Sequence, residues 1–226
     1  MEPQPPRPDR RARRRAETRN EILDLALGVM REEGVAGLSL AEVARRLGVK
    51  PPSLYKYFPS RHAVYDALFQ IGQEAYLDVV QRASAEAAGS AGSAGLPALG
   101  AALEAGARWI MENQTLAQLL FWRPVPGFTP SAEAYAPALA IHGHMASLIR
   151  SAVDRGELHP DAASQEGLAL AASLIAGVVS QQLANEPDVR YEDGRFTRLV
   201  PRLPSLLAAA YPPPQPRRPA PGRRRS

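Results

Sequence analysis

Apolar residues recur at intervals of three and four along most of this chain, which is the spacing of one face of a helix. The first such stretch is predicted to begin near Thr18, because Thr18 and Glu21 have the spacing of a capping box, and it carries apolar residues from Ile22 to Met30. No segment of the sequence alternates apolar and polar residues over the length of a strand. The pattern therefore predicts an all-α fold.

Two short helices and one long helix are predicted next. Ser39 and Glu42 repeat the capping-box spacing, and Gly48 ends the first short helix. Pro51 opens the second, where a missing backbone amide costs no hydrogen bond, and Ser60 caps a long helix over about 61–88. The positions predicted to face inward are Leu40, Val43, Ala44 and Leu47 in the first short helix, and Val64, Leu68, Ile71, Ala75 and Val79 in the long one.

The rest of the chain continues the helical pattern. A Gly/Ser/Ala run at 89–95 predicts a flexible loop, and a Pro/Gly segment at 123–130 breaks the periodicity. Pro201 and Pro204 are expected to kink or shorten the last helix, because proline removes a helical hydrogen bond. Helices are predicted over about 97–113, 115–122, 132–155, 162–184 and 195–210.

Composition narrows the chemistry of the 226-residue chain. It contains no cysteine, which excludes disulfides, thiolate metal sites and cysteine nucleophiles. None of the four histidines are paired four apart on a helix, so we predict no metal site and no cofactor. No catalytic constellation is recognisable, and the chain is not expected to be an enzyme.

The net charge of +4 is unevenly distributed. Residues 1–20 hold seven arginines against three acidic residues, and residues 211–226 hold five arginines and no acidic residue. The stretch 71–210 is acidic overall. Arginine-rich ends indicate a polyanionic partner, with a solvated tail as the alternative.

One uncharged segment, 167–185, raises the question of a membrane span. Its strongly apolar part runs only from Leu168 to Val179, whereas a bilayer crossing needs about 20 apolar residues. We therefore predict a buried helix, no membrane association, and a soluble, cytoplasmic protein.

The two short helices, joined by 48–50, have the proportions of a helix-turn-helix, whose second helix enters the major groove of DNA. The segment LSLAEVARRLGV–KPPSLYKYFPSR, residues 38–61, closely resembles the DNA-binding domain of TetR-family repressors. The resemblance extends over about 18–68 and includes the Gly-Val turn, the Leu-Tyr-x-Tyr-Phe ending and the Pro-Ser-Arg entry to the long helix.

The resemblance implies a role for each matching position. Base edges are expected to be read from the start of the second helix, and phosphates to be bound by hydroxyl and basic groups around it. Ala41 departs from the pattern, because some members carry a base-reading arginine there. The expected DNA contacts are Ser39, Lys50, Pro51, Ser53, Tyr55, Lys56, Tyr57 and Arg61. As alternatives, Tyr57 could be a core residue, and Lys50, Lys56 and Arg61 could be solvated charges.

The N-terminal arginines are a further candidate for DNA contact. As a flexible arm they would reach a neighbouring minor groove or phosphates, and the alternative is an inert tail. The segment that follows them, residues 21–70, carries no net charge, because it holds six basic and six acidic residues. The arm consists of Arg11, Arg13, Arg14, Arg15 and Arg19.

A dimer is expected, because one helix-turn-helix reads too little DNA and two copies read two half-sites. The predicted helix 162–184 is apolar on nearly every side, so a second copy would cover part of it, and an intramolecular core is the alternative. The resemblance implies that this helix and the last one form a four-helix bundle with a partner. The candidate interface residues are Leu168, Ala172, Ile175, Val179, Leu203 and Leu207.

Bulky side chains gather in the middle of the sequence, as in a ligand pocket or a plain core. The candidate ligand contacts are Trp109, Phe121, Trp122, Phe128, His142 and Met145. Residues 1–16 are predicted to be a disordered basic arm, 17–62 the DNA-binding domain, 63–211 a ligand-sensing and dimerisation domain, and 212–226 a disordered basic tail.

The resulting hypothesis is a homodimeric transcriptional repressor that a small-molecule ligand releases from a palindromic operator. The alternatives are a ligand-independent repressor or activator, and an architectural DNA-binding protein.

Overall fold

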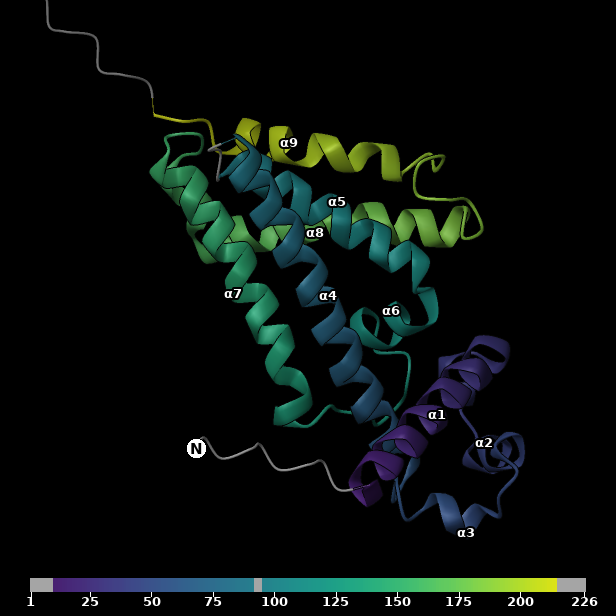
Figure 1. Ribbon diagram of the computed structural model, residues 1–226. Helices are drawn as coiled ribbons and strands as arrows, with labels where there is room; N and C mark the ends of the chain where they lie inside the picture. The colour runs from purple at the N-terminus through teal and green to yellow at the C-terminus, as the bar shows by residue number, and fades with distance from the viewer. Residues whose placement is uncertain (1–9, 92–94, 215–226) are drawn as a thin grey trace, which may run out of the picture. The chain divides into compact units, whose positions relative to one another are not determined.

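A computed structural model describes residues 10–91 and 95–214 of the chain. All regular structure in these ranges is helical, which confirms the predicted all-α fold (Figure 1). In chain order the elements are α1 Arg10–Glu33, η1 Val35–Gly37, α2 Leu40–Leu47, α3 Pro51–Leu54, α4 Arg61–Ala91, α5 Leu96–Glu112, α6 Gln114–Phe121, α7 Ala132–Asp154, η2 Pro160–Ala163, α8 Gln165–Asn185, η3 Thr197–Arg202 and α9 Leu203–Ala210, where η denotes a 3-10 helix.

These elements form two compact units, each with its own core. The N-terminal unit comprises residues 1–77 and 112–140, and therefore holds α1, α2, α3 and α6. The C-terminal unit comprises 78–111 and 141–226, and holds most of α5 together with α8 and α9. The helices α4 and α7 contribute residues to both units.

Helix α1 begins earlier than the sequence pattern predicts. It starts at Arg10, so residues 10–16 are helical and not disordered, whereas residues 1–9 lie outside the described ranges. The Thr18 hydroxyl donates a hydrogen bond to the carbonyl of Arg14 at 3.0 Å within the helix, so Thr18 is not its N-cap. Arginine and alanine are strong helix formers, and this local preference prevails over a composition typical of a disordered arm.

The core of the N-terminal unit joins α1 to the start of α4. Ile22 and Val29 of α1 and Val64 of α4 are fully buried. Tyr65 is also fully buried, and its hydroxyl donates a hydrogen bond to the carbonyl of Val35 at 2.6 Å. This bond satisfies the one polar atom of the Tyr65 side chain and holds α4 against the segment that follows α1.

The inward face of α4 follows positions four apart, and one prediction for it is wrong. Ile71 was expected to face inward but is 45% exposed. Val80 is 1% exposed, whereas the predicted Val79 is only partly buried. The covered stripe runs through Leu68 and Gly72, and Ile71 lies beside it.

Proline shapes the end of the described chain as expected. The predicted continuous helix over 195–210 is divided into η3, which contains Pro201, and α9, in which Pro204 lies in the first turn.

The loop predicted at 89–95 begins later than expected, because α4 continues to Ala91. Residues 92–94 lie outside the described ranges.

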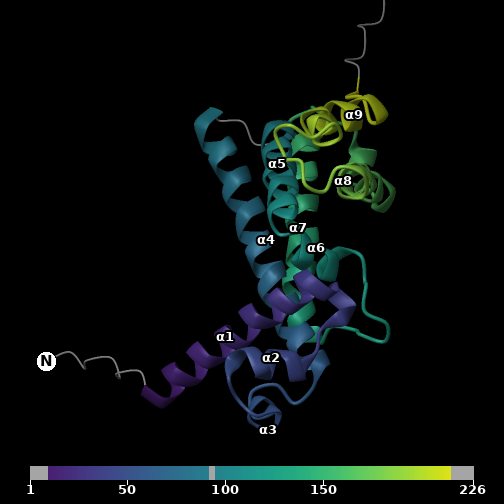
Figure 2. The same cartoon turned by 90° about the vertical axis from the view of Figure 1, so that its right-hand side faces the viewer.

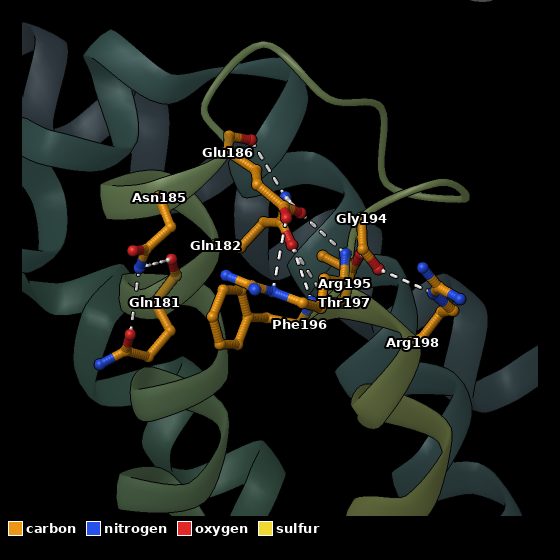
Figure 3. A network of polar contacts seen from close by, with 9 residues as sticks. All are labelled: Gln181, Gln182, Asn185, Glu186, Gly194, Arg195, Phe196, Thr197 and Arg198. Carbon is orange, nitrogen blue, oxygen red and sulfur yellow. Dashed lines mark hydrogen bonds and ion pairs between the residues drawn. The ribbon is translucent and has the colours of Figure 1, made fainter.

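A polar network organises the loop between α8 and η3 (Figure 3). Gln182 is fully buried, and its side-chain oxygen accepts hydrogen bonds from the backbone N–H groups of Phe196 at 3.0 Å and Thr197 at 3.3 Å. Its amide nitrogen donates to the carbonyl of Glu186 at 3.0 Å, beyond the end of α8. A buried amide with this many partners fixes where the chain turns back after α8.

Two further residues complete this network. The carboxylate of Glu186 accepts the backbone N–H of Arg195 at 2.9 Å, and this hydrogen bond lowers the pKa of Glu186 below its ordinary value. Gly194 allows the close approach, because a Cβ atom there would lie 2.6 Å from the side-chain oxygen of Gln182. Figure 3 shows the side chains of α8 and the residues before η3 converging on this point.

Candidate nucleic-acid interface

The first short helix, α2, is fixed at both ends by local hydrogen bonds. The hydroxyl of Ser39 accepts the backbone N–H of Glu42 at 3.4 Å, as the capping-box spacing predicts. The other half of the box is replaced, because the carboxylate of Glu42 binds arginines instead of the backbone of Ser39. At the C-terminal end, Gly48 adopts the left-handed conformation, with φ 74° and ψ 24°. This conformation favours glycine and turns the chain towards α3.

The reading segment, which we define as residues 50–58, contains α3 and the turn that follows it. Lys50 is extended, with φ −74° and ψ 142°, and Pro51 is the first residue of α3. Leu54 and Phe58 are each 1% exposed and anchor the segment in the core. The side chains predicted to contact DNA lie on the outside: Lys50, Pro51, Tyr55 and Lys56 are exposed, and Ser53 and Tyr57 are half-buried.

Two phosphate-binding candidates flank this segment. Ser39 precedes α2 and is exposed, and its hydroxyl hydrogen is still available because the oxygen acts as the acceptor for Glu42. Arg61 is the exposed first residue of α4. Ser60 caps that helix as predicted, since its hydroxyl accepts the backbone N–H of Ala63 at 3.1 Å.

An ion-pair network neutralises the arginines of α2. Arg45 binds the carboxylate of Glu42 through two nitrogens, at 2.8 and 2.7 Å. Arg46 contacts Glu42 at 2.7 Å and Glu32 of α1 at 2.6 Å. The hydrogen bonds from Arg45 and then Arg46 lower the pKa of Glu42 to about 2. The pairs with Glu42 lie three and four residues apart within α2, a signal that is visible in the sequence.

Sequence reasoning missed one contact beside the reading segment. The guanidinium of Arg19 lies 4.3 Å from the ring centroid of Phe58 and donates to the carbonyl of Tyr57 at 3.5 Å. The first contact is a cation–π interaction and the second a long hydrogen bond. Arg19 thus connects α1 to the end of the reading segment, over a sequence separation that no local pattern reveals.

Comparison with known proteins supports this arrangement. Residues 22–68 match the family model described as bacterial regulatory proteins, tetR family. Residues 22–68, which we call the TetR-type domain, are therefore similar to the N-terminal domain of that family. The tetracycline repressor class A of transposon 1721 from Escherichia coli is 43% identical over 49 residues, which cover 22% of this chain and 23% of the repressor.

Longer matches extend beyond the TetR-type domain. The HTH-type transcriptional regulator Rv1816 of Mycobacterium tuberculosis is 27% identical over 139 residues, which cover 61% of this chain. The match spans 58% of the length of that relative. The TetR-family regulator PfmR of Thermus thermophilus has the same fold, with a TM-score of 0.63 at 18% identity, over 82% of this chain and 96% of that structure.

All six candidate ligand contacts lie outside the TetR-type domain. They are divided equally between the two units. In the N-terminal unit, Phe121 contacts Tyr76 edge-on at 5.3 Å between ring centroids, and Phe128 lies 5.5 Å from Tyr65. Phe121 and Trp122 are exposed by 40% and 38%. The other three candidates are Trp109, which is buried, Met145, which is half-buried, and His142, which is exposed.

The histidine of α7 that faces inward is His144, two residues after the predicted ligand contact His142. His144 lies with its Nε2 atom 2.9 Å from the hydroxyl of Ser84, which is 3% exposed. Burial lowers the pKa of His144 below its ordinary value. The uncharged ring is therefore favoured in the C-terminal unit.

Half of the residues predicted for the dimer interface are core residues of a single chain. Val179, Leu203 and Leu207 are between 1% and 3% exposed, so they cannot form the surface of an interface. Leu168 and Ile175 are half-buried, and Ala172 is exposed. The periodicity of α8 and α9 identifies apolar positions without saying whether the same chain or a partner covers them.

The exposed face of α8 is nevertheless apolar. Only 17% of its most apolar 18-residue stretch is buried. Among the described helices, α8 alone is long and apolar enough to cross a membrane, judged by length and composition. This differs from the prediction, which rested on the shorter apolar run from Leu168 to Val179. The small exposed residues of this face are Ala169, Ala172, Ser173, Ala176 and Gly177.

Proposed function

We propose that this chain is a transcriptional regulator of the TetR family that binds operator DNA. The observation that carries the proposal is the reading segment, in which Leu54 and Phe58 are buried while Lys50, Tyr55 and Lys56 project from the same short stretch. Lysine and serine side chains at the start of a second helix are suited to base edges and phosphates. In this proposal residues 17–62 bind DNA, and the protein is cytoplasmic.

The regulator acts as a homodimer that reads a palindromic operator. The exposed small residues of α8 support this part of the proposal, because they allow a second helix to approach closely and an apolar face of this kind is covered in solution. Leu199 of η3 and Leu206 of α9 are 41% and 51% exposed, and they add exposed apolar surface to the same unit. A second copy of the chain offers the same face, as a two-fold symmetric interface requires.

The dimer is a repressor that a small-molecule ligand releases from DNA. The ligand binds within residues 63–211 and favours a conformation in which the two reading segments no longer match the half-site spacing. Bulky apolar side chains with a few polar groups, such as Trp109, Met145 and His144, support a sensor in this region.

An architectural DNA-binding protein is the second candidate function, and the arginine-rich ends of the sequence favour it. It binds duplexes through phosphates, so its affinity falls steeply with salt and depends little on sequence. Sequence preference at near-physiological salt therefore separates the two functions.

Selection of bound DNA from a random pool, with the full-length protein, tests the proposal. A palindrome with half-sites about one helical turn apart is expected to be enriched. The double variant K50A/S53A is the matched control, because both side chains lie outside the core and their loss should abolish enrichment without unfolding the protein. Recovery of unrelated sequences by the wild type contradicts the proposal and favours the architectural function.

A further inference from the structure

The N-terminal part of α1 presents arginines in an ordered array. Because α1 begins at Arg10, the residues Arg11, Arg15 and Arg19 lie four apart on one helix. Positions four apart share a face. We call these three residues the arginine stripe. The same face continues into the buried residues Leu23 and Ala26. The stripe therefore continues, beyond the core, the side of α1 that packs against the rest of the N-terminal unit.

One end of the arginine stripe is anchored at the reading segment. Arg19 lies over the ring of Phe58 at 4.3 Å and donates to the carbonyl of Tyr57. Figures 1 and 2 show the N-terminal end of α1 descending to the side of the N-terminal unit on which α3 lies. Arg15 and Arg11 follow one and two turns further out, about 6 and 12 Å from Arg19 along the helix axis.

The part of α1 that carries the stripe is strongly basic, because residues 10–19 hold six arginines and one glutamate. Arg45 and Arg46 are held by Glu42 and Glu32. In this part of α1 Arg13 pairs with Glu17 at 2.8 Å, on a different face from the stripe. Arg15 is exposed. The stripe therefore adds positive charge along the side of α1 that continues into its buried face.

We propose that the arginine stripe is a rigid phosphate clamp, which holds the DNA backbone immediately outside the half-site. The inference rests on the proposed DNA-binding function and adds a second contact region to it. The stretch of about 12 Å from Arg19 to Arg11 corresponds to about three to four nucleotides of one strand, at roughly 3.4 Å each. A preformed helix loses less conformational entropy on binding than a flexible arm. Its arginines also donate two parallel hydrogen bonds to a phosphate.

The test compares two double variants of the full-length protein that remove equal charge. R11A/R15A removes the outer stripe, and R10A/R13A removes two arginines from the opposite face of the same helix; alanine preserves the helix in both. Affinity for a duplex of about 40 base pairs carrying the selected operator is measured over a salt series. R11A/R15A is expected to reduce the slope of log K against log salt by about 1.8 per protomer, since each phosphate contact contributes about 0.9. R10A/R13A is expected to change it by less than half as much.

Two further measurements distinguish a rigid helix from a flexible arm. A16P retains every arginine but interrupts the helix between Arg15 and Arg19, and it is expected to reproduce the loss seen in R11A/R15A. A duplex trimmed to the outer ends of the two half-sites lacks these flanking phosphates, and on it the wild type should bind with the salt slope that R11A/R15A shows on the longer duplex.

Equal slopes for the two double variants, or full binding by A16P, overturn the inference. These outcomes leave the proposed function intact, because specific binding is measured separately in the random-pool selection. If the wild type enriches no motif, the proposed function fails. The same salt series on an unselected duplex of the same length then decides whether the arginine stripe binds phosphates.

Discussion

The helix-turn-helix and helix α8 are both built on apolar stripes, but they differ in the residues that they leave exposed. Around α3 the apolar Leu54 and Phe58 are buried, and the exposed residues are mostly polar. On α8 the buried residues are Gly167, Val179 and the polar Gln182, while Ala172 and Ala176 are exposed. The first region completes its core within one chain, whereas the second leaves an apolar face to be covered.

This difference implies two kinds of stability. A core that is closed within one chain unfolds with a free energy independent of protein concentration. A face that is covered by a second copy contributes stability that rises with concentration, because association and folding are linked. Substitutions in the two regions should therefore behave differently on dilution.

The largest effect is expected from a charge on the exposed face of α8. A176R places a guanidinium where a partner helix is proposed to pack, and an unpaired charge there opposes association. We expect the dissociation constant of the dimer to rise by about 1,000-fold or more, equivalent to about 4 kcal/mol. Analytical ultracentrifugation over a dilution series measures it.

A substitution on another exposed apolar residue provides the control for A176R. Leu139 of α7 is 62% exposed, and L139R adds the same charge outside the proposed interface. It should leave the dimer intact. A dimer that persists in A176R but dissociates in L139R would move the interface to α7.

The next largest effect concerns the closed core of the helix-turn-helix. F58A removes a ring that is 1% exposed and the surface on which Arg19 lies, so it should lower the free energy of unfolding by about 3–5 kcal/mol. Urea unfolding at two protein concentrations should give the same loss. Y55A, at a ring that is 50% exposed, should cost much less, and comparable losses for the two would contradict the closed-core description.

A smaller effect is expected at the turn between α2 and α3. Gly48 has φ 74°, and a Cβ atom there would meet nothing within 4 Å, so the cost of G48A comes from the backbone alone. We expect a loss of about 1 kcal/mol in the free energy of unfolding. G89A is the matched control, because this glycine lies within α4 with open space around it and alanine should stabilise the helix by about 0.5–1 kcal/mol. Thermal unfolding that shifts in the same direction for both variants would contradict the argument.

The smallest effect is a pH dependence at the exposed network of α2. Arg45 and Arg46 lower the pKa of Glu42 from 4.5 to about 2, so the folded state favours the charged carboxylate. Its stabilisation is present above pH 4.5 and is lost as the pH falls towards 2. The difference in stability between the wild type and E42Q should therefore shrink over this range. A difference that is constant between about pH 7 and about pH 3 would show that the ion pairs contribute nothing.

The sequence predicts the turns of the TetR-type domain well, because their signals act over a few residues. Ser39, Gly48 and Ser60 are each recognisable by type and spacing, and each makes the expected local hydrogen bond or backbone turn. The division of the last helix by Pro201 and Pro204 is predictable for the same reason.

Features that depend on partners distant in sequence are not predictable in this way. Periodicity places Val179, Leu203 and Leu207 on apolar faces, but their burial is decided by packing within the C-terminal unit. The contact of Arg19 with Phe58 likewise depends on how α1 crosses the reading segment. The early start of α1 is a different case, since the helix propensity of arginine and alanine is visible in the sequence and outweighs a composition typical of disorder.

The segment between α6 and α7 is rich in proline and glycine, and segments of this kind are common insertion points for tags. Its attachments argue against that choice. The carboxylate of Asp66 in α4 accepts both the N–H of Ser131 at 2.7 Å and its hydroxyl at 2.8 Å, and the ring of Phe128 lies 5.5 Å from that of Tyr65. A reporter peptide spliced in beside Phe128 would detach these anchors from the first turns of α4. It would therefore damage the N-terminal unit, and a tag on this chain needs another insertion point.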